Sequence, residues 1–282
     1  MRSRCKSIGL ELDISVGTVY RVDRSILYSS RLAMQRRALE SRTCDPDSVF
    51  RSILREKHFP NHASPHTPAA LVLRYSLYNI AASHSLSVDV GDLSRTKYDP
   101  TNPAHERRLL RLWEIMRPGV PLEDRYTDQW QDIGFQGKDP STDFRGMGLL
   151  GLEDLLYYGA KYPELALHTL EGSRSNLDSW YSYAIVGINI TSFAVECLHN
   201  RSLQYFLFRY GTSMDIYHEF YCYLFASFHH YWITRTPRPS IMQFTPVFED
   251  FKTLMRIELQ ERKPVILDEA SPALYHRLKK DQ

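Results

Sequence analysis

Residues 102–116 read NPAHERRLLRLWEIM, and this stretch contains both signals that decide the fold. Asn102 has a short polar side chain that can accept a hydrogen bond from a free amide at a helix start. Pro103 suits the first helical position because its missing N–H would have no partner there. The apolar residues that follow recur at the i, i+3, i+4 and i+7 spacing of one helical face: Leu109, Leu112, Trp113 and Met116. The stretch therefore predicts an amphipathic α-helix over 103–117.

The same pair of a capping residue and a proline recurs along the chain, at Asp45-Pro46, Thr67-Pro68, Thr245-Pro246 and Ser271-Pro272. Each pair precedes a helix-like pattern, and alternating strand-like patterns bounded by turns are absent. We therefore expect an all-α fold. The expected helices cover residues 25–42, 46–57, 68–84, 103–117, 124–132, 149–161, 163–171, 178–198, 201–210, 214–233, 246–262 and 272–280.

The composition changes along the chain. Residues 85–101 are polar and irregular and form the expected linker between a basic helical extension and an aromatic-rich globular core. Residues 1–60 carry twelve basic and seven acidic side chains, a net charge of +5. This charge is typical of a solvated helical face, and it would also suit contact with an anionic membrane surface.

The overall composition limits the function. The formal net charge of the 282 residues is +2, so no strong field favours nucleic acid. The four cysteines are scattered without a CxxC pair, which fits a reducing compartment. The most apolar stretch, 184–198, is shorter than the ~20 residues that a membrane span needs. We expect a cytoplasmic protein, with peripheral contact to organelle membranes as the role left open for the basic extension.

One glycine-rich stretch stands apart. Residues 130–152 read WQDIGFQGKDPSTDFRGMGLLGL and hold five of the chain's 13 glycines. Residues 146–151 have the G-x-G-x-x-G spacing, but no strand precedes them, as dinucleotide binding requires. Gly137-Lys138 is followed by Asp139, where a Walker loop needs Ser or Thr. The chain is therefore not expected to bind a nucleotide itself.

Metal and nucleophile motifs are weak. His218-Glu219 is followed at i+4 by Cys222 and not by the second histidine of a zincin helix. No Gly-x-Ser-x-Gly elbow is present in the sequence. Neither metal nor nucleophilic chemistry is predicted.

Arg145 is the remaining candidate. It lies between Phe144, expected to be buried, and Gly146, expected to let the backbone turn sharply. A guanidinium fixed in this way would suit the charge that develops on phosphoryl oxygens during transfer. The alternative is an ion pair with Asp139 or Asp143 that holds the loop shut. The residues alone leave both open.

The longer run WQDIGFQGKDPSTDFRGMGLLGLEDLLYY resembles the signature of the ELMO domain as found in ELMO domain-containing (ELMOD) proteins. The matching positions align without gaps: Trp130, Gly134-Phe135-Gln136-Gly137, Asp139-Pro140, Thr142-Asp143 and Arg145-Gly146. The resemblance covers about residues 104–263, which leaves the extension 1–100 and a tail 264–282 with a short helix. It implies a helical domain that stimulates GTP hydrolysis on the GTP form of an Arf-family or Arf-like small GTPase, with Arg145 at the family's essential arginine.

The other signature residues have expected roles. Loop support or partner contact is expected of Gln136, Gly137, Asp139, Asp143, Gly146 and Gly148. Trp130 and Phe135 are expected core anchors. Gln136 could orient the attacking water or brace the loop, and the two aspartates are interpreted as caps for loop and helix-start amides.

No cofactor is expected, because GTP and magnesium would belong to the partner GTPase. The longer ELMO proteins give a rival interpretation, since there the domain is an interaction module for exchange factors. A non-catalytic effector that binds the GTP-loaded GTPase is the third. The longer ELMO proteins resemble this signature less well and lack an arginine at the position of Arg145, whereas the sequence does not exclude the effector.

Overall fold

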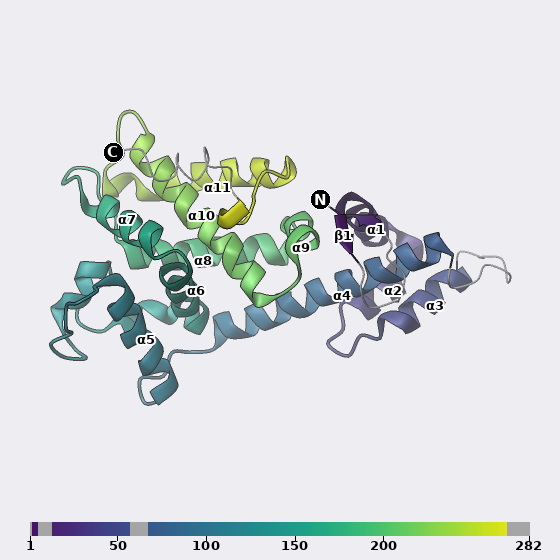
Figure 1. Cartoon of the computed structure of the whole chain (residues 1–282), viewed down its shortest axis with the longest axis horizontal. Helices are drawn as coiled ribbons and strands as arrows, with labels where there is room; N and C mark the ends of the chain where they lie inside the picture. Colours follow the sequence, from purple (N-terminus) through teal and green to yellow (C-terminus); the bar gives the residue numbers. More distant parts are fainter. Residues whose placement is uncertain (1, 5–12, 57–66, 270–282) are drawn as a thin grey trace. The chain divides into compact units, whose positions relative to one another are not determined.

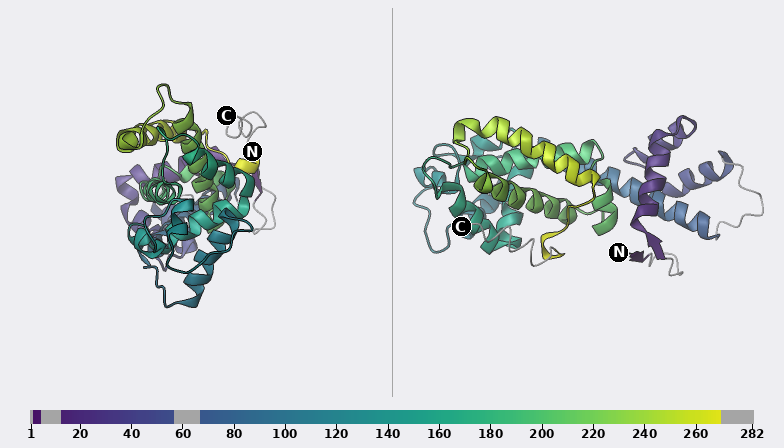
Figure 2. Two further views of the ribbon diagram at one scale, coloured as in Figure 1. Left: turned by 90° about the vertical axis from the view of Figure 1, so that its left-hand side faces the viewer. Right: turned by 90° about the horizontal axis from the view of Figure 1, so that it is seen from above.

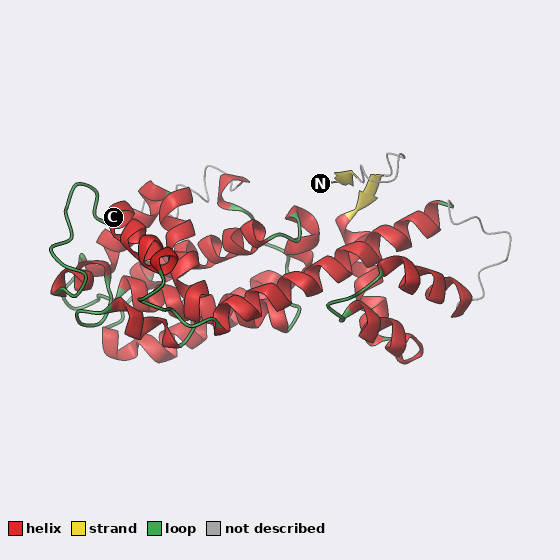
Figure 3. Cartoon of the chain, turned by 90° about the horizontal axis from the view of Figure 1, so that it is seen from below, coloured by secondary structure: helices red, strands yellow, loops and turns green. Residues whose placement is uncertain are grey.

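The computed structural model describes residues 2–4, 13–56 and 67–269. The chain forms two compact units, each built from two segments. Unit 1 comprises Met1–Asp89 and Leu203–Met214, and unit 2 comprises Val90–Ser202 and Asp215–Gln282. Figure 1 gives the order of the elements. Within the described residues, helices dominate and one short antiparallel strand pair is present (Figure 3), so the expected all-α fold is confirmed.

Unit 1 consists of short helices and the first part of one long helix, α4. Its elements are β1 (Arg2–Arg4), β2 (Asp13–Ser15), α1 (Val16–Tyr28), η2 (Ser30–Leu32), α2 (Ala33–Leu39), α3 (Pro46–Glu56), α4 (Pro68–Arg95) and α9 (Gln204–Tyr210). The strands pair with Arg2 opposite Ser15. Ser15 also starts α1, because its hydroxyl accepts a hydrogen bond from the Thr18 amide at 3.3 Å.

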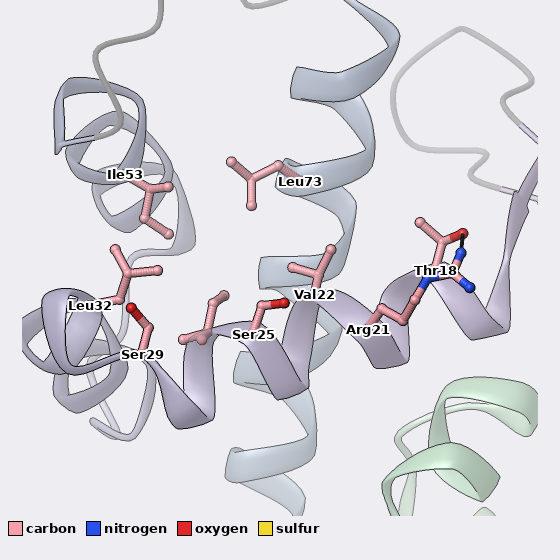
Figure 4. Close-up of a pocket in the computed structure, with 9 residues that line it drawn as sticks. Thr18, Arg21, Val22, Ser25, Ser29, Leu32, Ile53 and Leu73 are labelled. Carbon is pink, nitrogen blue, oxygen red and sulfur yellow. Dashed lines mark hydrogen bonds between the residues drawn. The ribbon is translucent and has the colours of Figure 1, made fainter.

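The helices of unit 1 share one apolar core. It includes Val19 of α1, Ile53 of α3 and Phe208 of α9, all buried. The Asp47 carboxylate ties α3 to α4, since it accepts two hydrogen bonds from Arg74 at 2.7 and 2.9 Å. Apolar side chains of α1, η2, α3 and α4 also line a cavity of about 470 Å³ (Figure 4).

Unit 2 is a helical bundle with two 3-10 helices in its longest connection. Its elements are the end of α4, α5 (Pro103–Met116), η3 (Asp128–Ile133), η4 (Pro140–Arg145), α6 (Gly148–Lys161), α7 (Pro163–Arg174), α8 (Tyr183–His199), α10 (Met214–Thr234), η5 (Ile241–Gln243), α11 (Phe244–Gln260) and η6 (Leu267–Glu269).

Helix α6 is central to unit 2, because it packs against α5, α7 and α8. Its residues Leu150, Leu152, Leu155 and Tyr158 are fully buried. Helix α11 lies alongside α10 (Figure 2), and the ring of Phe228 meets the rings of α11 residues edge-on. The aromatic-rich part of the sequence thus forms this core.

Helix starts are confirmed where a capping side chain is present. The Asn102 side chain accepts a hydrogen bond from the Ala104 amide at 2.9 Å, so α5 begins at Pro103 as expected. Asp45 and Thr67 cap α3 and α4 in the same manner. Helix α11 begins at Phe244, ahead of the expected start at residue 246. Ser271-Pro272 and the expected helix 272–280 lie outside the described residues.

Three expectations about elements are wrong. The expected linker 85–101 is helical as far as Arg95, because α4 keeps burying apolar residues such as Leu86 and Val90. The expected helix 25–42 is split, since Ser29 is extended at the end of α1. The expected helix 124–132 is the 3-10 helix η3, which begins after Thr127. The boundaries proposed for the extension, domain and tail stay predictions.

The described residues contain no helix with both the length and the apolar character required to cross a membrane.

Candidate functional site

A row of aromatic rings in contact supports the glycine-rich loop. The ring of Trp130 meets those of Trp113 and Phe135 edge-on, with centroids 5.4 and 6.0 Å apart. Phe135 in turn meets Phe144 at 5.5 Å, and Phe144 stacks on Tyr98 at 5.5 Å. Trp130 is 0% exposed and its indole N–H donates to the Arg125 carbonyl at 3.0 Å. Both 3-10 helices of the loop are thereby fixed on a rigid apolar base.

A charged network surrounds this base. Nε of Arg125 donates to Glu106 on α5 at 2.6 Å, and its Nη1 lies 3.2 Å from Oδ1 of Asp139. Glu106 also accepts a hydrogen bond from the Tyr98 hydroxyl at 2.5 Å. The Arg125 side chain is only 18% exposed, so its charge is weakly screened. The network joins α5, the segment that follows α4 and the start of η4.

The two aspartates of the loop act through hydrogen bonds to its backbone. Asp139 caps η4, because its Oδ1 accepts the Ser141 amide at 3.1 Å. Burial alone would raise the pKa of Asp139, but hydrogen bonds from Ser141 and the charge of Arg125 hold it below its ordinary value. The Asp143 carboxylate accepts a hydrogen bond from the Gln136 backbone amide at 2.8 Å, and this bond ties η4 to the turn after η3. Burial raises the pKa of Asp143.

Glycine is required at two places in this region. Gly134 has φ +82°, and an added Cβ would lie 2.4 Å from the Tyr183 amide nitrogen. Gly148 has φ +52°, and an added Cβ would lie 2.4 Å from the Thr96 carbonyl. Gly137 has φ +69° but faces open space. The expectation for Gly146 is wrong, since it is in the ordinary αR conformation and the sharp turn falls at Gly148, where the backbone meets the end of α4.

Arg145 is exposed at the end of η4. Its Nε donates to the Thr142 carbonyl at 2.7 Å, which fixes the side chain at its base. No carboxylate forms an ion pair with it in the part of the chain that the structure describes, and Asp139 pairs instead with Arg125. The charge of Arg145 acts on Asp143, where it lowers the pKa against the larger effect of burial, but the two side chains form no direct ion pair. The two Nη groups make no hydrogen bond to other described residues and are available to a partner.

The side chain of Gln136 is also exposed. Gln136 braces the loop through its backbone amide and not through its side chain. The side-chain amide makes no hydrogen bond to other described residues.

A cavity of about 490 Å³ opens beside Arg145. It is lined by Ser94, Arg95, Lys97, Tyr98, Ser141, Phe144, Arg145, Gly146 and Gly148. The residues from 94 to 98 were missed by the sequence reasoning because they fall in the expected linker. Arg125 was missed as well, since nothing in its local sequence marks a buried charge.

His218 makes a polar contact inside the bundle. Its Nδ1 lies 2.7 Å from Oδ1 of the fully buried Asp154 on α6, and its ring stacks on Tyr157. Burial raises the pKa of Asp154. The pair reads as an internal polar contact between α6 and α10.

Comparison with known proteins gives one consistent result. The model of the ELMO/CED-12 family matches residues 89–248. ELMO domain-containing protein 2 of Mus musculus is 38% identical over 236 residues, covering 82% of this chain and 78% of that protein. ELMO domain-containing protein 1 of Mus musculus is 39% identical over 207 residues, covering 67% and 63%, respectively. ELMO domain-containing protein B of Dictyostelium discoideum is 31% identical over 254 residues, covering 89% and 88%. No solved structure matches the chain significantly.

The glycine geometry gives a matched pair of variants. We expect Gly148→Ala to lower the free energy of unfolding by about 2–4 kcal/mol, because the new Cβ meets a backbone carbonyl at a strained φ. Gly146→Ala should change it by less than about 1 kcal/mol, since its φ is ordinary and the space is open. Urea unfolding of both variants measures the difference. Equal stabilities would contradict the position of the turn.

The aromatic base gives a second prediction. Trp130→Ala should cost about 3–5 kcal/mol of unfolding free energy through the cavity that it leaves. Leu177→Ala is the control, because Leu177 is 92% exposed and its loss should cost less than about 0.5 kcal/mol. A Trp130→Ala protein that melts like the wild type would show that this ring does not carry the loop.

Proposed function

The chain belongs to the ELMO/CED-12 family, and we propose that it stimulates GTP hydrolysis on an Arf-family or Arf-like small GTPase by supplying Arg145 in trans. Membership of the family supports a role in the regulation of small GTPases. In this proposal GTP and its magnesium ion belong to the partner, and the chain supplies only side chains. The nearby residues Gln136 and Gly137 contact the partner's surface.

One observation carries the proposal: Arg145 is exposed, forms no ion pair with a described residue and follows loop residues that are held in place. Phe144 beside it is 1% exposed. Asp143 is held by a hydrogen bond from the Gln136 amide, and Asp139 by its ion pair with Arg125. A planar guanidinium matches phosphoryl oxygens with two parallel hydrogen bonds. Such an arginine stabilises the charge of the transition state without reorganisation at the moment of reaction.

The alternatives predict different behaviour. An interaction scaffold or a non-catalytic effector would bind the GTPase and leave its hydrolysis rate unchanged. Single-turnover GTP hydrolysis against a panel of Arf-family and Arf-like GTPases separates these roles from the proposed one.

The central prediction concerns Arg145 itself. We expect Arg145→Lys to lose nearly all stimulation, as Arg145→Ala does, because a point charge cannot replace the planar fork. An arginine supplied in trans is worth about 10³–10⁵ in rate. Arg107→Lys is the control, since Arg107 is exposed on α5 and lies outside the cavity beside Arg145. All three variants should melt like the wild type, and near wild-type hydrolysis with Arg145→Lys would contradict the role.

We further propose that exposed arginines of unit 1 contact anionic membrane lipid. Arg31 and Arg37 are exposed. Each basic residue near such a surface contributes up to about 1 kcal/mol of attraction. This contact would bring the catalytic loop to a membrane-bound GTPase.

The lipid contact is tested by charge removal in the full chain. The double variant Arg31→Gln/Arg37→Gln should co-sediment less with phosphatidylserine vesicles at low salt than the wild type. The double variant Arg107→Gln/Arg238→Gln, altered at exposed positions of unit 2, is the control and should sediment normally. High salt should abolish the difference through screening. If the unit 1 variant sediments like the wild type, its charges form only a solvated face.

A further inference from the structure

The cavity beside Arg145 combines an aromatic floor with a cationic rim. Tyr98 and Phe144 provide the floor, with their rings stacked at 5.5 Å. The rim carries Arg95, Lys97 and Arg145, and no carboxylate is among the described residues that line the cavity. A site of this composition attracts a group that is anionic at one end and apolar along its stem.

The three cations of the rim are not equivalent. Arg95 donates to Asp92 at 2.7 Å, so its charge is offset within its own helix. Arg145 has its Nε fixed by the Thr142 carbonyl. Lys97 is exposed and forms neither an ion pair nor a hydrogen bond with other residues that the structure describes. Lys97 is thus a charge beside the cavity that no described ion pair offsets.

We propose that this cavity receives an acidic side chain of the partner GTPase and that Lys97 pairs with its carboxylate. The inference rests on the proposed function and adds the chemistry by which the partner is held. In this proposal Lys97 contributes to the affinity for the partner GTPase, and Arg145 sets the maximal rate of GTP hydrolysis.

The chemistry favours a carboxylate over a phosphate at Lys97. An ammonium is a compact point charge on a flexible stem, which pairs with a mobile surface carboxylate without strict geometry. The volume of about 490 Å³ exceeds what a single oxyanion fills, and the two rings suit the methylene stem of a glutamate or the apolar neighbours of an aspartate.

A role in the fold alone would give a different result. Lys97 follows the C-terminus of α4, where a cation is favourable beside the negative end of the helix dipole. That role would lower the melting temperature of a Lys97 variant and leave partner binding unchanged.

The test measures binding and hydrolysis separately with the full chain. The GTPase is the panel member that binds the wild type most tightly in its GTP-loaded form, measured by interferometry. We expect Lys97→Ala to raise the dissociation constant and the concentration for half-maximal stimulation about 3–10-fold, and Lys97→Glu more than about 10-fold, because like charges at a rim repel. The maximal rate and the melting temperature should not change. Lys138→Ala is the matched control, since Lys138 is an exposed lysine of the same loop that pairs with Asp128 and lies outside the cavity.

Charge reversal on the partner identifies the anion. One acid-to-lysine variant of the GTPase should restore binding to Lys97→Glu, while no variant should rescue Arg145→Ala. If none restores binding, or if Lys97→Ala binds like the wild type, the assignment is overturned, even where Arg145→Lys abolishes stimulation and the proposed function stands. If Arg145→Lys keeps full stimulation while Lys97→Ala weakens binding, the arginine role fails and the docking assignment holds. Absence of binding by every GTPase of the panel overturns both.

Discussion

Arg125 makes the interaction on which the whole loop depends. Its guanidinium pairs with Glu106 on α5 and with Asp139 at the start of η4. Its backbone carbonyl accepts a hydrogen bond from the indole N–H of Trp130. A partly buried charge of this kind is expensive to leave without its partners, because removal of one partner strands the other in a low dielectric. The same residue therefore fixes the register of the two 3-10 helices against the bundle.

For the proposed role of Arg145, this fixation has a kinetic consequence. A side chain that must find its position during the reaction loses conformational entropy at that moment, whereas one held by its surroundings has already lost it. The Thr142 carbonyl holds Nε of Arg145, and Asp143 holds the turn at Gln136. Only the outer part of the guanidinium remains to be ordered by a partner.

Features that depend on neighbouring residues could be predicted from the sequence. Asn102 with Pro103 predicted the start of α5, and the signature run predicted the family. Contacts between segments that are distant in the sequence could not be predicted. Arg125 is buried only because Glu106 and Asp139 converge on it, and the cavity exists only because α4 continues to Arg95 and meets the backbone at Gly148. The assignment of the turn to Gly146 failed for the same reason, since neighbouring glycines look equivalent until the opposing backbone is placed.

Helix α9 has a consequence for synthesis on the ribosome. Phe208 belongs to the core formed by α1, α2, α3 and α4, and the ring of Tyr205 meets that of Tyr20 at 5.8 Å. The last part of unit 1 is thus translated only after the family signature and helices α5 to α8 have been translated. The nascent N-terminal helices must wait with an open apolar face, so their folding cannot proceed strictly in the order of translation.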